Sequence, residues 1–250
     1  SRLANALTKR IRWVVSISEV TAKRFRSWVP AATQQLRVLP NAIHAELYGP
    51  GAKNPGLLAR YGLAGKTVLD IGANDGYFTL AALLSGAAEA TAINSLDWGT
   101  YPDNVNWAAA QWRVSPRLLV GDYRTYPFER RYDVIMFLGV LYHLEDVFGT
   151  MKLLHNLLRD DGVLYLETQM SQVQSSLPLF EYASDSYPTI APQNKRGLDM
   201  VGISNYLFPN HTAILNLATS YDFEAESLDG PANEYLRAMP SRGLYKLRKC

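Results

Sequence analysis

Short apolar segments alternate with helical segments along the chain after Lys66, and this order limits the possible folds more than any other feature. The predicted strands are Thr67–Ile71, Ala90–Asn94, Arg117–Val120, Tyr132–Leu138, Gly162–Glu167, Phe223–Leu228 and Gly243–Leu247. The segments with helical spacing are Tyr77–Leu84, Asp103–Gln111, Asp146–Leu158 and Thr212–Thr219. Because apolar strands joined by helical crossovers form parallel sheets that are covered on both faces, we expect an α/β fold. The sheet is predicted to be seven-stranded and mostly parallel, with helices on both faces.

Length and composition fit one large domain with an appendage. The chain has 250 residues, of which 48% are hydrophobic, enough to bury a sizeable core. The single cysteine, Cys250, excludes a disulfide within the chain and favours a reducing compartment. Apolar runs such as Val134–Leu141 are too short to span a bilayer, and residues 1–30 do not resemble a signal peptide. We therefore expect a cytoplasmic protein without a membrane span; the absence of an initial methionine suggests a processed fragment.

Charge divides the chain into two parts. Residues 1–66 contain 11 Lys and Arg against two acidic residues, a net charge of +9. The whole chain has 25 basic and 23 acidic residues, so the remainder has 14 basic and 21 acidic residues, a net charge of −7. We predict an N-terminal α/β appendage at 1–65 and a main domain at 66–250. A basic face can bind nucleic acid, but a solvated face or one docked on an acidic neighbour is the simpler interpretation.

The appendage has its own pattern of elements. Strands are predicted at Arg12–Ser18 and Gln35–Leu39, a helix at Ser18–Trp28, and a Gly/Pro linker at Tyr48–Pro55.

The stretch T-V-L-D-I-G-A-N-D-G-Y-F carries the most specific chemistry. A strand ends in Asp70, and Gly72 and Gly76 follow with a spacing of four residues. Glycine lets the backbone turn sharply and approach a ligand closely. A dinucleotide site favours G-x-G-x-x-G, whereas this loop has Asn74 at the middle glycine position and adds carboxylates. The loop therefore suits a cationic sulfonium better than a diphosphate.

This stretch resembles the first motif, D-x-G-x-x-x-G, of Rossmann-like methyltransferases. The resemblance implies S-adenosyl-L-methionine as the cofactor, with its methionine and sulfonium end at Asp70, Gly72 and Gly76. The acidic residue that binds the ribose in this family falls on Asn94, where Asp97 can compensate for the missing charge, and the adenine-binding acid matches Asp122 in L-V-G-D-Y. The other predicted cofactor-binding residues are Asn74, Ser95, Tyr123 and Leu138.

A finer resemblance lies in F-L-G-V-L-Y-H-L-E-D, which spans Phe137–Asp146. It is similar to tRNA wobble-uridine carboxymethyltransferases and related small-molecule methyltransferases, as is the later Asn205–Leu217 segment. The resemblance implies the fold and the cofactor but not the acceptor.

Three side chains are candidates for the acceptor side of the site. His143 is the first choice as a general base because its unperturbed pKa lies near neutrality, although a hydrogen bond within its loop is an equal alternative. Tyr142 stands beside it, and Glu167, at the end of the fifth strand of the domain, is a second candidate base with helix capping as its alternative. Many methyl transfers need only alignment of the nucleophile.

Other polar and aromatic residues have weaker assignments. The polar segment Ser171–Asn210 is predicted to be an irregular lid or acceptor insertion. His211 is either an acceptor-pocket residue or the start of a helix. Trp98 and Tyr101 either flank the adenine or pack in the core.

Residues 1–66 resemble a different family. The segments V-V-S-I-S-E-V-T-A-K-R-F, R-V-L-P-N-A-I-H and L-L-A-R-Y-G-L-A-G-K are similar to the interdomain region of GT-B retaining glycosyltransferases. The resemblance implies a glycosyltransferase domain fused or associated at the N-terminus, but no glycosyl transfer by these residues alone.

Methyl transfer to a small molecule or glycan is thus the leading hypothesis. The alternatives are tRNA wobble-uridine modification and a non-catalytic binding module. The −7 balance of the main domain makes nucleic acid an unlikely partner.

Overall fold

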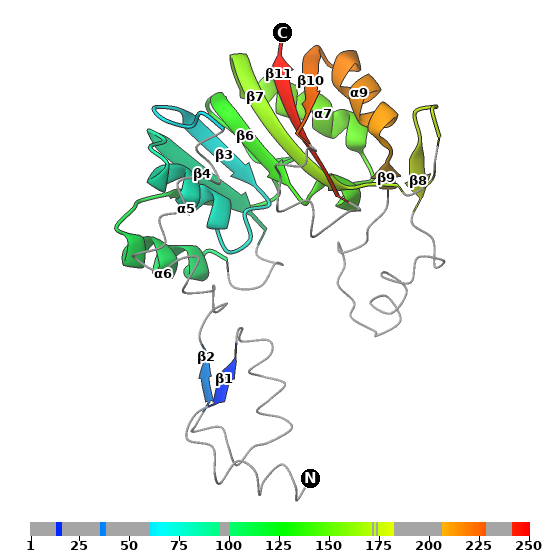
Figure 1. Cartoon of the computed structure of the whole chain (residues 1–250). Helices are drawn as coiled ribbons and strands as arrows, with labels where there is room; N and C mark the ends of the chain where they lie inside the picture. The colour runs from blue at the N-terminus through cyan, green and yellow to red at the C-terminus, as the bar shows by residue number, and fades with distance from the viewer. Residues whose placement is uncertain are drawn as a thin grey trace, which may run out of the picture.

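A single seven-stranded sheet forms the centre of the main domain. The computed structural model describes residues 14–16, 36–38, 61–95, 101–171, 173, 175–182, 207–228 and 242–250. The strands of the sheet are β3 (Thr67–Ile71), β4 (Glu89–Asn94), β5 (Arg117–Val120), β6 (Tyr132–Leu138), β7 (Leu158–Gln169), β10 (Phe223–Ser227) and β11 (Arg242–Lys249). Their order across the sheet is β10-β11-β7-β6-β3-β4-β5 (Figure 1). Only β11 runs antiparallel to its two neighbours in this sheet, so the predicted fold class is confirmed.

The strand order reverses at β3. The chain proceeds from β3 to β4 and β5 on one side, then returns to β6 on the other side of β3. In open α/β sheets such a switch point leaves a crevice at the carboxyl ends of the two diverging strands, where ligands bind. The residues that follow β3 and β6 are therefore the first place to look for a site.

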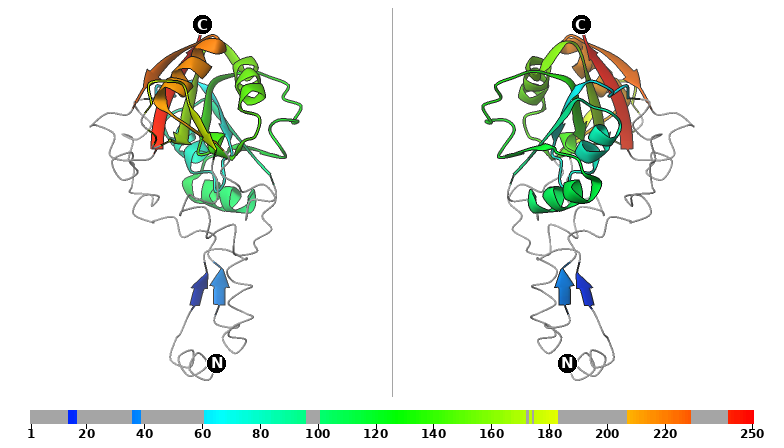
Figure 2. Two further views of the ribbon diagram at one scale, coloured as in Figure 1. Left: turned by 90° about the vertical axis from the view of Figure 1, so that its right-hand side faces the viewer. Right: turned by 90° about the vertical axis from the view of Figure 1, so that its left-hand side faces the viewer.

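Helices cover both faces of the sheet. They are α5 (Tyr77–Leu84), α6 (Asp103–Trp112), α7 (Val147–Leu157) and α9 (His211–Ser220), with a short 3₁₀ helix, η2, at Leu141–His143. The views in Figure 2 place α5 and α7 on opposite sides of the sheet. The predicted helices agree with these bounds to within a residue or two, but Leu158 is the first residue of β7 rather than the end of a helix.

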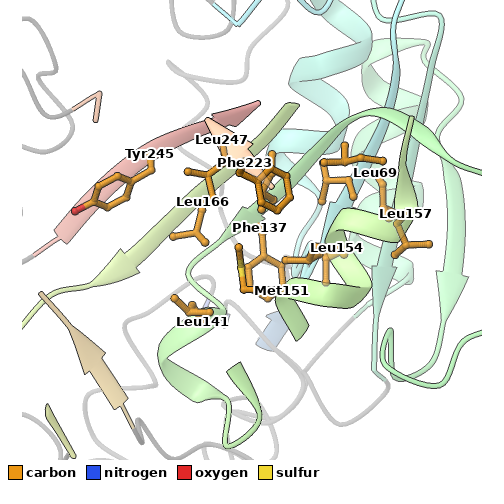
Figure 3. Close-up of a cluster of buried hydrophobic side chains, with 14 of the residues drawn as sticks. Leu69, Phe137, Leu141, Met151, Leu154, Leu157, Leu166, Phe223, Tyr245 and Leu247 are labelled. Carbon is orange, nitrogen blue, oxygen red and sulfur yellow. The ribbon is translucent and has the colours of Figure 1, made fainter. Parts of the chain in front are cut away.

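The face under α7 and α9 holds the largest apolar cluster. Strand residues alternate between the two faces of a sheet, so Leu69 of β3 and Phe137 of β6 share this face with Leu166 of β7 (Figure 3). Met151 and Leu154, three residues apart on α7, pack against them. Burial of these side chains is the main source of stability for this face.

The opposite face is covered by α5 and α6. Val68, one residue before Leu69, points to this side and packs with Ala82 of α5 and Met136 of β6. Asp70 occupies the same face, two residues further along β3. The strand that carries the predicted cofactor motif thus directs its carboxylate toward α5.

The insertion predicted as irregular contains regular structure at its base. β8 (Phe180–Tyr182) pairs antiparallel with β9 (Leu207–Pro209). Asn210 joins this pair to α9: its Oδ1 accepts from the backbone N–H groups of Ala213 and Leu179, and its Nδ2 donates to the Leu177 carbonyl at 2.8 Å. The residues between Tyr182 and Leu207 lie outside the described part of the chain.

In the appendage, β1 (Val14–Ser16) and β2 (Leu36–Val38) pair in parallel, within the two segments predicted as strands. The helix predicted between them and the Gly/Pro linker lie outside the described residues. Across the described residues, none of the helices has the length and hydrophobicity needed to cross a membrane.

Candidate functional site

The loop between β3 and α5 is held tightly against two neighbouring elements. Gly72 and Gly76 have φ angles of 73° and 79°, in the left-handed region that glycine adopts without strain. A Cβ at Gly72 would lie 2.7 Å from Val140 Cγ2, and one at Gly76 would lie 2.6 Å from Val105 Cγ1. Asn74 also has a positive φ, 48°. The two glycines therefore permit both the turn and the close approach that the motif predicts.

Asp70 is a buried carboxylate at the end of β3. It is 2% exposed, and its Oδ2 accepts a 2.6 Å hydrogen bond from the Thr79 hydroxyl of α5. Burial raises the pKa of Asp70 to about 6, although the hydrogen bonds from Thr79 oppose the shift. No cation is recorded against this carboxylate among the described ion pairs. A positively charged ligand would offset the cost of keeping it ionised.

Asn94 ends β4 next to the glycine loop. The backbone N–H of Gly72 donates to the Ile93 carbonyl, and the N–H of Gly121 donates to the Asn94 carbonyl, both at 3.0 Å. Asn94 is 8% exposed, yet its Nδ2 has no hydrogen-bond partner in the described structure. A buried amide that lacks a partner is costly, so this group suits a ligand oxygen such as a ribose hydroxyl. Ser95 follows it directly, and Asp97 lies outside the described residues.

Asp122 and Tyr123 follow β5 at the same edge of the sheet. Asp122 is partly exposed, and Arg124 donates to both of its carboxylate oxygens, which holds its pKa below the ordinary value. The Tyr123 ring packs edge-on against Phe137, and its hydroxyl lies 3.4 Å from Thr150 Oγ1. Burial raises the pKa of Tyr123 to about 12. The backbone N–H of Arg124 also donates to Asp122 Oδ1, so Arg124 contacts each carboxylate oxygen twice in this structure.

Tyr101 takes the packing role rather than the adenine-flanking one. Its side chain is buried, and its hydroxyl donates to the carbonyls of Ala92 and Leu119 at 3.0 and 2.7 Å. These bonds join Tyr101 to β4 and β5. Trp98 lies outside the described residues.

A second group of side chains gathers where β6 and β7 end. Leu138 is the half-buried last residue of β6, and η2 follows with Tyr142 and His143, whose rings lie 4.2 Å apart. Tyr142 also faces Arg242, the first residue of β11, with the guanidinium carbon 4.8 Å from the ring centre. His211, by contrast, begins α9 and pairs with the Tyr245 hydroxyl.

Glu167, the second candidate base predicted from the sequence, is held in an ion pair. Arg242 donates to both of its carboxylate oxygens through Nε and Nη2, and the Glu167 side chain is only 6% exposed. The ion pair fixes this carboxylate against β11, so the geometry favours a positioning role. Arg242 had no signal in the sequence, because its partner is 75 residues away and is reached only through the β7–β11 register.

One further feature of the described domain lies away from this edge. A small hollow lined by Arg117, Tyr126 and Arg130 lies by the amino ends of β5 and β6, on the opposite side from the glycine loop. No group of three or more potential metal ligands occurs in the described part of the chain.

Comparison with known families gives one match that covers most of the chain. Residues 50–228 match the family described as methyltransferase domain. A tRNA U34 carboxymethyltransferase of Serratia proteamaculans is 31% identical over 115 residues, which cover 42% of this chain and 33% of that protein. A ubiquinone biosynthesis O-methyltransferase of Pseudomonas paraeruginosa is 30% identical over 116 residues, which cover 44% of this chain and 47% of that protein. The matches thus span a third to a half of the length of these relatives.

Solved structures share the fold at low sequence identity. A 1,6-didemethyltoxoflavin N1-methyltransferase of Burkholderia thailandensis, with its substrate and S-adenosylhomocysteine bound, matches 96% of this chain and 93% of its own. The TM-score is 0.54 and the identity 16%. The N-terminal domain of EvdMO1, solved with S-adenosylhomocysteine and D-fucose, gives a TM-score of 0.57 at 16% identity over 81% of this chain and 85% of its own. At these identities the likeness concerns the fold.

Proposed function

Since the chain belongs to the methyltransferase domain family, we propose that it is an enzyme that transfers the methyl group of S-adenosyl-L-methionine to a small-molecule or glycan acceptor. The cofactor supplies an electrophilic methyl group on a positively charged sulfur. The observation that carries the proposal is that a buried carboxylate and a buried amide lie at the same edge of the sheet, and that the amide nitrogen has no partner among the described residues. These are Asp70 and Asn94, at the ends of adjacent strands.

The residues at this edge suit three parts of the cofactor. Asp70 and the backbone of Gly72 to Gly76 would hold the cationic methionine end, because a buried carboxylate gains most from a cation. The Nδ2 of Asn94 would donate to a ribose hydroxyl, and Ser95 follows it in the chain; Asp97, predicted from the sequence to compensate for the missing charge, lies outside the described residues. Asp122 would contact the adenine, and Tyr123 and Leu138 would provide further contacts with the cofactor.

We place acceptor binding at the carboxyl ends of β6 and β7. We assign His143 as the base that removes a proton from the acceptor. Tyr142, whose ring contacts His143, is assigned as the residue that orients it. Glu167 binds Arg242 beside them. Segment 171–210, whose described base is the β8–β9 pair, contributes to acceptor selection.

Two similar proteins and one sequence resemblance support a small-molecule or glycan acceptor. The Pseudomonas relative is named for ubiquinone biosynthesis, and the EvdMO1 domain was solved with a sugar. The resemblance of residues 1–65 to a glycosyltransferase also favours a glycan. We therefore propose that a fused or associated glycosyltransferase domain supplies the acceptor.

Modification of tRNA is the second candidate, because the Serratia relative is a tRNA U34 carboxymethyltransferase. The charge balance of −7 in the main domain disfavours a large RNA footprint. A gel-shift with tRNA distinguishes the two: binding that survives deletion of residues 1–60 supports the tRNA hypothesis, and no binding supports the small acceptor.

Calorimetric titration with S-adenosyl-L-methionine tests the proposal itself. We expect saturable binding with one site for each chain. Folded protein that shows no heat of binding, and no protection against thermal unfolding, contradicts the proposal. Cofactor binding without methyl transfer to any acceptor favours a non-catalytic binding module.

A further inference from the structure

Three polar side chains from three different elements surround one glycine at the end of β6. The Cβ position of Gly139 lies 3.5 Å from Arg242 Nη2, 3.6 Å from Tyr142 Oη and 3.7 Å from Glu167 Oε2. Gly139 itself is partly exposed and is fixed by a 3.0 Å hydrogen bond from its N–H to the Glu167 carbonyl. The absence of a side chain here leaves a small space whose neighbours are a cation, an anion and a hydroxyl.

The ion pair beside this space is deeply buried. The side chains of Glu167 and Arg242 are 6% and 16% exposed, and Arg242 also lies over the Tyr142 ring. Removing two charges from water costs about as much as their attraction returns, so apolar residues of similar size often stabilise a protein equally well. The position of the pair at the carboxyl edge of the sheet points to a role in binding.

We propose that Arg242, Glu167 and Tyr142 form an acceptor subsite that takes a neutral hydroxyl group. This inference rests on the proposed function and adds the chemical class of the acceptor. The pair has no net charge, and a hydroxyl both donates and accepts, so it satisfies Glu167 and Arg242 together. A charged group gains from one member of the pair about what it loses to the other, so nothing at this point offsets the cost of removing its charge from water. The subsite therefore selects hydroxyl-bearing acceptors such as sugars over charged ones.

A second pair in the same domain provides a matched control. Arg130 binds Glu89 through two nitrogen atoms and lies over the Tyr132 ring at 5.1 Å. Glu89 and Tyr132 begin β4 and β6, so this pair lies at the amino ends of the strands. It repeats the Arg–Glu–Tyr arrangement away from the site.

Three sugars with a common skeleton test the subsite. D-galactose, D-galacturonate and D-galactosamine are neutral, anionic and cationic at pH 7. Saturation-transfer NMR would measure their binding to protein already loaded with S-adenosylhomocysteine, whose own affinity is determined separately by calorimetry. We expect D-galactose to bind and the two charged sugars to bind more weakly.

Variants then assign the effect to the three side chains. Arg242→Lys keeps the charge but loses the two-nitrogen geometry, and we expect it to weaken D-galactose about tenfold. Glu167→Gln leaves the guanidinium charge uncompensated, so D-galacturonate becomes the preferred sugar. Tyr142→Phe, the mildest change, retains the ring under Arg242 and weakens D-galactose without a change in thermal stability. Arg130→Lys leaves all three affinities unchanged.

The result that overturns the subsite is separate from one that overturns the function. If the loaded protein fails to bind D-galactose, prefers a charged sugar, or responds alike to Arg242→Lys and Arg130→Lys, the subsite assignment is wrong. If S-adenosylhomocysteine itself does not bind, the proposed function fails first. Should Arg242→Lys or Glu167→Gln not fold, an unchanged D-galactose affinity in Tyr142→Phe overturns the subsite.

Discussion

Replacing Asp70 with asparagine tests whether the site is built for a cation, because the two side chains have nearly the same shape and differ in charge. In the ligand-free protein, the Asp70 carboxylate is buried beside the Thr79 hydroxyl and forms no ion pair with another described residue. Its ionised form therefore opposes folding. Asparagine keeps a carbonyl oxygen for the hydroxyl and removes the charge, so we expect Asp70→Asn to stabilise the ligand-free protein.

The size of this effect follows from the pKa of Asp70, which burial raises from 3.8 to about 6. As the pH rises through this range the unfolded chain releases its proton before the folded protein does, so the free energy of unfolding falls and then levels off above about pH 6. A pKa difference of about two, at 1.36 kcal/mol for each unit, amounts to about 3 kcal/mol at pH 7. Allowing for a weaker bond to Thr79, we expect Asp70→Asn to gain about 1–3 kcal/mol.

Urea denaturation at pH 7 and pH 5, without ligand, measures this gain. The wild-type carboxyl is mostly protonated in the folded state at pH 5, so the advantage of the variant should shrink to about half. The same substitution should weaken S-adenosyl-L-methionine binding at least about tenfold, because the attraction to the cation is lost. A variant that is less stable than wild type at pH 7, or that binds the cofactor equally well, refutes the reasoning.

Asp133 is the matched control for this experiment. Burial opposes ionisation there too, but hydrogen bonds from Thr67 and the charge of Arg159 hold the pKa of Asp133 below its ordinary value. Its carboxylate therefore stabilises the folded state at pH 7. Asp133→Asn should lower the free energy of unfolding and leave cofactor binding unchanged.

Three further substitutions separate folding from binding. Gly76→Ala places a Cβ 2.6 Å from Val105 Cγ1 at a φ of 79°, so the free energy of unfolding should fall by about 2–4 kcal/mol; an unchanged denaturation midpoint contradicts this. Asn94→Ala removes an amide whose Nδ2 has no partner in the described structure, so S-adenosylhomocysteine affinity should drop about tenfold with little change in melting temperature. A large loss of stability with normal affinity argues against the assignment. Lys249→Met removes a buried ammonium that donates to two carbonyls at the end of α7, so thermal unfolding should show a loss of about 1–3 kcal/mol; equal stability would mean that the apolar stem suffices.

Periodicity was sufficient to predict the sheet. The bounds of β3, α5, β5 and β6 agree with the predicted ranges because each is a short apolar run closed by glycine or polar residues. β7 begins earlier than predicted, at Leu158, because Asp161 adopts a φ of 60° and the register against β6 shifts between Tyr132 and Val134. Such a bulge leaves no periodic signal. The β8–β9 pair was missed because each strand has only three residues.

Local motifs indicate the proposed cofactor edge, whereas the proposed acceptor edge depends on contacts between distant segments. Asp70, Gly72 and Gly76 lie within one turn, so their spacing alone indicates a close backbone approach. The prediction of Glu167 as a base came from its place at a strand end. Its bond to Arg242 could not be predicted in this way, because Arg242 lies on an antiparallel strand 75 residues later. Sequence spacing carries no information about such a pair.

A crystal structure of the protein with S-adenosylhomocysteine would test the central claim most directly, because that product keeps every part of the cofactor except the transferred methyl group. The account predicts the amino acid end of the ligand beside Asp70 and Gly72, a ribose hydroxyl within hydrogen-bond distance of Asn94 Nδ2, and the adenine near Asp122. A ligand bound elsewhere, or crystals that remain without it at saturating concentration, would contradict the assignment of this edge of the sheet.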